Sequence, residues 1–109
     1  MMKCKACGKE IDEHVAGFEM DMCVMVAVFG RKRRDFGYYR NKYSENIADA
    51  YQMEERIAEL GMEKEYGKHL CISVDQLWYL QEFKDVWSLI HATPEERCKA
   101  ALMMVSYIE

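Results

Sequence analysis

The chain has 109 residues, a net charge of −4 from 15 Lys and Arg against 19 Asp and Glu, and 50% apolar or aromatic residues. This size and composition suit one domain with a real core and exclude an intrinsically disordered chain. The longest apolar-rich stretch, residues 18–29, contains Glu19 and Asp21 and is shorter than the roughly 20 residues that cross a bilayer. No membrane partner is therefore expected.

The N-terminus carries a Cys pair and has no apolar segment typical of a secretory signal. We therefore expect a cytoplasmic protein with reduced thiols. Cys4 and Cys7 have the C-x-x-C spacing of a zinc knuckle, followed by Gly8. His14 is the nearest further ligand, so Cys4, Cys7 and His14 are the predicted zinc ligands. The rest of the site stays open between a second chain's knuckle and the remaining thiols and imidazoles, namely Cys23, His69, Cys71, His91 and Cys98.

The alternative interpretation is that the Cys pair binds no metal and belongs to an unliganded N-terminal segment. On either interpretation, residues 1–16 are a Cys-bearing N-terminal extension and residues 17–109 are a single domain. The domain opens with GFEMDMCVMVAVF, residues 17–29, which is apolar on nearly every side. A helix of this kind is buried on more than one face or contacts a partner chain, so we also expect a homodimer. Gly30 can end the helix.

The next segment, residues 30–43, concentrates positive charge. It holds six cations against Asp35, a net +5, which leaves −9 for the rest of the chain. Cations contact phosphates, and interleaved aromatic rings can stack on bases. The predicted contact residues for nucleic acid, a nucleotide or an acidic partner protein are Arg31, Lys32, Arg33, Arg34, Tyr38, Tyr39, Arg40 and Lys42. The alternative is a solvated loop that neutralises the chain's own acidic surface.

Residues 44–60 carry apolar side chains at spacings of three and four, which predicts an amphipathic helix. Ser44 is its expected N-cap and Gly61 its expected C-cap. Its carboxylates indicate a solvated face, and they are Glu45, Asp49, Glu54, Glu55 and Glu59.

Residues 68–74 alternate between apolar and polar, which predicts a half-buried strand. Residues 77–91 favour two strands of a hairpin, although a helical stripe also fits them. Thr93, Pro94 and Glu96 then form a capping box that opens a C-terminal helix. The predicted fold is α/β (α+β), an α-β-α sandwich in which three helices cover a small antiparallel sheet of two or three strands.

Three ordered blocks, EMDMCVMVAVFG, YSENIADAYQMEERI and VWSLIHATPEERCKAALMMV, resemble the phage ABA (α-β-α) sandwich domain family. They span roughly residues 18–107. The resemblance implies a small phage or prophage protein with that sandwich fold, working in the cytoplasm of a bacterial host cell. It brings no catalytic residues.

A Cys-His dyad from Cys71 with His69 or His91 has no third group to orient it, so these side chains are expected to pack or to face solvent. We expect a non-enzymatic protein that acts by binding, as an anti-defence factor that blocks a host protein or nucleoprotein complex such as CRISPR, or that captures a nucleotide. The alternative is a nucleic-acid-binding accessory protein that uses residues 30–43.

Overall fold

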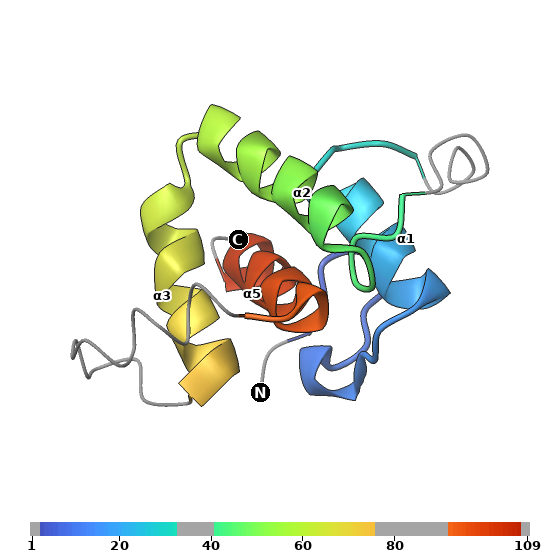
Figure 1. The fold of residues 1–109 in the computed structure, drawn as a ribbon. Coiled ribbons are helices and arrows are strands. Elements are labelled where there is room, and N and C mark those ends of the chain that lie inside the picture. Colours follow the sequence, from blue (N-terminus) through green and yellow to red (C-terminus); the bar gives the residue numbers. More distant parts are fainter. Residues whose placement is uncertain (1–2, 33–40, 76–91, 108–109) are drawn as a thin grey trace.

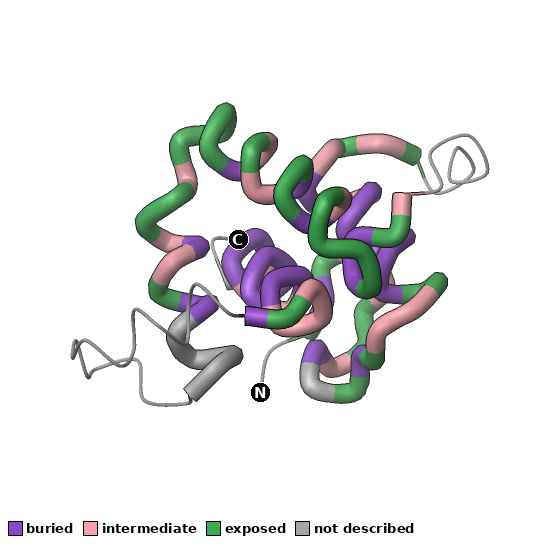
Figure 2. Tube along the Cα trace, viewed as in Figure 1, coloured by how far each residue is buried: buried purple, intermediate pink, exposed green. Residues whose placement is uncertain are grey.

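Helix α5 (Pro94–Tyr107) is the central element of the structure, a computed structural model that describes residues 3–32, 41–75 and 92–107. The helices α1 (Phe18–Ala27), α2 (Ile47–Glu59) and α3 (Glu63–Asp75) surround α5, as Figure 1 shows. Buried residues lie along most of α5 (Figure 2), and several are 0% exposed: Cys98, Ala100, Ala101, Leu102 and Met104. A helix buried in this way needs neighbours on several sides, and three of its neighbours are helices.

The start of α5 confirms the predicted capping box. The Thr93 backbone N–H donates to Glu96 Oε1 at 2.8 Å, and the Glu96 N–H donates to Thr93 Oγ1 at 3.1 Å. Pro94 is the first residue of the helix, where its missing N–H costs no hydrogen bond.

Helix α1 follows a short 3-10 helix, η1 (Ile11–Glu13). Every residue from Met20 to Met25 is buried, which confirms that α1 is covered on more than one face. After α1, Gly30 takes the positive φ of 67° that glycine adopts readily. The Arg31 N–H then donates back to the Met25 carbonyl at 3.3 Å, so the chain turns away at Gly30 as expected.

Helix α2 confirms the predicted amphipathic helix but corrects its N-cap. The cap is Asn46, whose Oδ1 accepts from the N–H groups of Ala48 at 2.9 Å and Asp49 at 3.2 Å. Ser44 instead donates to Asp21 of α1, through Oγ at 2.6 Å and through its backbone N–H at 2.8 Å. Ser44, two residues before the N-cap, therefore links the start of α2 to α1.

The C-terminal end of α2 agrees with the sequence. Gly61 takes a φ of 72°. The Gly61 N–H donates to the Ala58 carbonyl at 3.0 Å, and the Met62 N–H donates to the Ile57 carbonyl at 3.2 Å. This pair of bonds is a Schellman motif, and it leads directly into α3.

The predicted strand over residues 68–74 is wrong, because this stretch lies within α3. Partly buried Met62 and buried Tyr66 and Leu70 repeat every four residues, and His69 is buried beside them. That is helical spacing. The alternation of apolar and polar residues over 68–74 is therefore part of a helix and not of a strand.

The predicted α-β-α sandwich is also wrong over the described residues, which form four α-helices and no sheet. The β pairing found there is an isolated antiparallel bridge between Lys3 and Glu10. The expected hairpin at 77–91 lies outside the described residues.

Candidate metal centre

Residues 3–10 form the tight turn that holds the Cys pair. The Cys4 N–H donates to the Lys9 carbonyl at 2.7 Å, and the Gly8 N–H donates to the Cys4 carbonyl at 2.8 Å. Gly8 has a φ of 80°, a left-handed conformation that glycine takes without a Cβ clash. This turn places both thiols of the pair on its inner side, where Cys4 is 2% exposed.

Four side chains converge beside this turn: Cys4, Cys7, His14 and Cys23. Their ligand atoms all lie within 4.8 Å of one another. His14 Nε2 is 3.2 Å from Cys7 Sγ and 3.7 Å from Cys23 Sγ. In a tetrahedral zinc site, bonds of about 2.3 Å to sulfur and about 2.0 Å to nitrogen put ligand atoms about 3.5 Å apart. The four side chains can therefore hold one metal ion.

The imidazole of His14 is oriented by a second contact. Its Nδ1 lies 3.0 Å from the Glu10 carbonyl, which can accept a hydrogen bond but cannot donate one. Nδ1 therefore carries the proton, and the lone pair of Nε2 faces the sulfur atoms. A metal-bound histidine is commonly fixed by a backbone carbonyl in this way.

The contact between the Cys4 and Cys23 thiols shifts their pKa values in opposite directions. Hydrogen bonding from Cys23 lowers the pKa of Cys4, and the backbone N–H groups of Cys7 and Ala6 add to this effect, against the burial of the thiol. The same contact with Cys4, together with burial, raises the pKa of Cys23. A bound cation would favour the thiolate form of both side chains, because a metal-bound cysteine is deprotonated.

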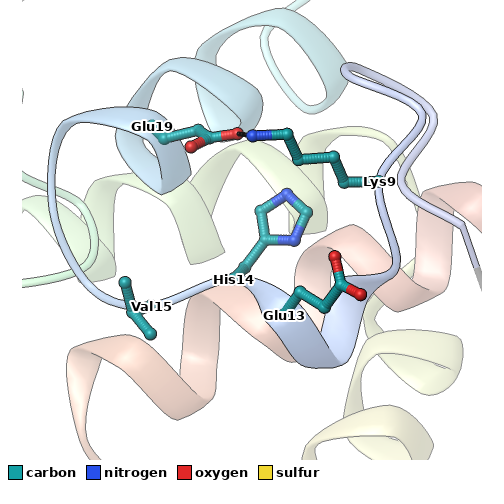
Figure 3. Close-up of a pocket in the computed structure, with 5 residues that line it drawn as sticks. All are labelled: Lys9, Glu13, His14, Val15 and Glu19. Carbon is teal, nitrogen blue, oxygen red and sulfur yellow. Dashed lines mark hydrogen bonds and ion pairs between the residues drawn. The ribbon is translucent and has the colours of Figure 1, made fainter.

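One member of the cluster, His14, also lines a surface pocket. This pocket has a volume of about 170 Å³. Figure 3 shows the residues that line it, which are Lys9, Glu13, His14, Val15 and Glu19. Lys9 Nζ and Glu19 Oε1 form an ion pair of 2.8 Å across it. His14 is the one metal-ligand candidate that lines this pocket, and it is only 5% exposed. His14 therefore belongs both to the cluster and to the lining of this pocket.

The other sequence-predicted ligands lie apart from this cluster or outside the described part of the chain. Cys98 is buried in α5 and His69 in α3, and neither belongs to the cluster. Nothing is described for the side chain of Cys71 or for His91. The structure thus brings together Cys4, Cys7 and His14, the ligands predicted from the sequence. It adds Cys23, which the sequence analysis named among the residues that could complete the site.

Cys23 had no distinguishing signal in the sequence, because it lies in the middle of the apolar run that forms α1. α1 packs over the N-terminal turn, and buried Cys4 and Ile11 share the core with Met20, Cys23 and Val24 of α1.

The basic segment is described only at its two ends. Arg31 is partly exposed, and Lys32 and Lys42 are exposed. Arg33, Arg34, Tyr38, Tyr39 and Arg40 lie outside the described residues. Tyr43, the last residue of the segment, is 1% exposed and belongs to the core.

No family model, curated protein or solved structure matches the chain. The resemblance to the phage sandwich family therefore stays a prediction. Among the described helices, none has the length and apolar character needed to cross a membrane.

Proposed function

We propose that this chain is a zinc-binding protein whose Zn²⁺ is structural and which acts by binding a partner. The observation that carries the proposal is the convergence of four ligand atoms, from Cys4, Cys7, His14 and Cys23, within 4.8 Å of one another. Three sulfurs and one imidazole nitrogen are the donor set that Zn²⁺ takes in closed structural sites.

The completeness of this set argues for a structural rather than a catalytic ion. A catalytic zinc site keeps one coordination position for water or substrate. Here four protein donors are enough to complete a tetrahedral set, and three of them (Cys4, His14 and Cys23) are at least 95% buried. An ion held in this way joins the N-terminal turn, η1 and α1 without reaching a substrate.

The ion would contribute directly to the stability of the fold. Structural zinc sites supply an apparent binding free energy of about 10–16 kcal/mol in zinc-finger peptides near neutral pH. Residues 4–23 hold all four donors, and the part of this span that precedes α1 has no α-helix, only the turn at 3–10 and η1. We expect the N-terminal turn to depend on the metal, whereas α2, α3 and α5 retain their own packing.

The test is native mass spectrometry of protein purified under reducing conditions without added metal, repeated after denaturation. One zinc per chain in the native spectrum, absent after denaturation, supports the proposal. The subunit count shows whether a second chain contributes ligands. Replacement by Co²⁺ should give the intense thiolate-to-metal charge-transfer and d–d bands of a tetrahedral site with three sulfurs. A reduced chain that takes up no zinc or cobalt at equimolar metal rules the proposal out.

A further inference from the structure

The three cysteines of the metal centre differ in their exposure to solvent. Cys4 is 2% exposed and Cys23 is 1% exposed, whereas Cys7 is only partly buried. His14, the fourth member of the centre, is 5% exposed. The susceptibility of a cysteine to oxidation follows its exposure and its thiolate character. Cys7 is therefore the member of the centre that a small oxidant in solution reaches first.

The turn that holds Cys7 also holds a second sulfur within reach of a disulfide bond. The Gly8 N–H donates to the Cys4 carbonyl at 2.8 Å, so Cys4 and Cys7 lie three residues apart in one closed turn. Cα atoms at this spacing in a turn are less than about 7 Å apart, and a disulfide joins Cα atoms about 4.4–6.8 Å apart. The two Sγ atoms lie within 4.8 Å of one another. Rotation of the side chains and a small shift of the turn can therefore close the bond.

Cys23 is a less favourable disulfide partner for Cys7. It lies within α1, between Met22 and Val24, which are both buried. A disulfide to Cys23 would have to pull the turn and a packed helix toward one another, and a close-packed interior resists such a displacement. A disulfide between Cys4 and Cys7 leaves α1 in place.

We infer that Cys7 is an oxidation site, at which a hydroperoxide converts Cys4 and Cys7 to a disulfide and thereby releases the metal ion. The inference rests on the proposed zinc centre, whose regulation it names. A metal-bound cysteine is a thiolate, and the thiolate is the form that peroxides oxidise.

The reaction has two steps, and hydrogen peroxide is the oxidant. The Cys7 thiolate attacks one peroxide oxygen, the O–O bond breaks, and the sulfur becomes a sulfenic acid while hydroxide leaves. The Cys4 thiolate then attacks the Cys7 sulfur, so that the S–S bond forms and the S–O bond breaks with loss of a second hydroxide. The two sulfurs lose two electrons and the peroxide gains them. Protons from solvent convert both oxygens to water.

The disulfide would leave the metal ion with too few ligands. His14 and Cys23 remain as donors, whereas a structural zinc site takes four. Zn²⁺ is therefore released, and the N-terminal turn is no longer joined to α1 by the metal. Reduction of the disulfide by an external thiol restores both thiolates, so the centre can bind zinc again.

The test uses zinc-loaded Cys71→Ser/Cys98→Ala protein, which keeps only the three cysteines of the centre, with the wild-type protein in parallel. Hydrogen peroxide is added in excess, because the nucleophilicity of a thiolate falls as its pKa falls and a metal-bound thiolate reacts slowly. A chromophoric indicator measures the released Zn²⁺, and peptide mass mapping after alkylation identifies the disulfide. We expect one zinc ion released per Cys4–Cys7 disulfide in both proteins, alkylated Cys23, and recovery of zinc binding after reduction.

Three results would overturn the inference. They are zinc retention with all three thiols still open to alkylation after denaturation, a disulfide that includes Cys23, and oxidation of Cys7 to the sulfinic acid without a disulfide. The zinc content before oxidation separates the two proposals. A reduced chain that takes up no zinc refutes the metal proposal and with it the regulated release, whereas a zinc-loaded chain that forms no Cys4–Cys7 disulfide refutes this inference alone.

Discussion

Arg97 of α5 and Glu54 of α2 form an ion pair in the interior, with Arg97 Nη1 donating to Glu54 Oε2 at 2.7 Å. The side chain of Arg97 is 7% exposed and that of Glu54 is 21% exposed. The Tyr66 hydroxyl of α3 donates to the same carboxylate oxygen. Burial, with this bond to Glu54, raises the pKa of Tyr66 above its usual range. One carboxylate thus joins three helices.

Replacing that carboxylate should be costly. Glu54→Gln keeps an acceptor for Tyr66 but leaves the charge of Arg97 buried without its counter-ion, which costs about 3 kcal/mol. Urea unfolding of the zinc-loaded protein measures the change. The control is Glu55→Gln on the exposed side of α2, where we expect less than about 0.5 kcal/mol. Equal effects at the two positions would show that the ion pair adds nothing.

Cys23 should be as important for metal binding as the C-x-x-C pair. Cys23→Ser removes a thiolate donor, so zinc affinity should fall by more than the roughly 10- to 100-fold that loss of an outer-shell contact costs. Competition with a chromophoric chelator measures the affinity. The control is Cys98→Ala, which removes a thiol that is also buried but lies outside the cluster. Unchanged affinity in Cys23→Ser would mean that the fourth ligand is another group.

The N-cap of α2 is a third test. Asn46→Ala removes the acceptor of two backbone N–H groups and should lower the free energy of unfolding by about 1 kcal/mol. Asn46→Asp should restore most of this stability, because a carboxylate caps equally well and suits the helix dipole. If Asn46→Ala is neutral in urea unfolding, the helix begins elsewhere.

His69 should make stability depend on pH. Burial of the imidazole lowers its pKa, Lys68 adds to this effect, and Glu65 opposes it. The folded state therefore favours neutral His69, and its stabilisation is complete above the unfolded pKa of about 6.5 and is lost as the pH falls below it. Relative to His69→Leu, the wild-type protein should lose stability on acidification in urea unfolding. Both proteins keep the zinc ligands, so the acid sensitivity of those ligands cancels in the comparison. A difference in the free energy of unfolding that does not change with pH would contradict the role of His69.

These residues show what the sequence could and could not predict. Thr93 and Glu96 form a capping box within four residues, and Gly61 ends α2 by its own backbone preference, so both features were readable locally. The segment 68–74 was misread because seven residues are too few to separate alternation from helical spacing; the helical period of α3 becomes clear only when Met62 and Tyr66 are included.

The side-chain partners were harder to predict because they depend on packing between helices. Glu54 lies in a charged stretch that resembles a solvated face, and only the approach of α5 makes it the partner of Arg97. Ser44 has the residue type of an N-cap, but Asp21 competes for its hydroxyl. In the metal centre, the C-x-x-C pair and His14 were close in sequence, whereas Cys23 joins them only after α1 has folded over the turn.

The central position of α5 has a consequence for how the chain forms during synthesis. α5 is translated after α1, α2 and α3. The apolar faces of these three helices therefore cannot pack against α5 until the last turn of α5 has left the ribosome. The four ligands of the metal centre, by contrast, all lie within residues 4–23 and emerge before α2, α3 and α5. A zinc ion captured at that stage would give the nascent chain one ordered element long before the core can close, and it would shield three thiols during the wait.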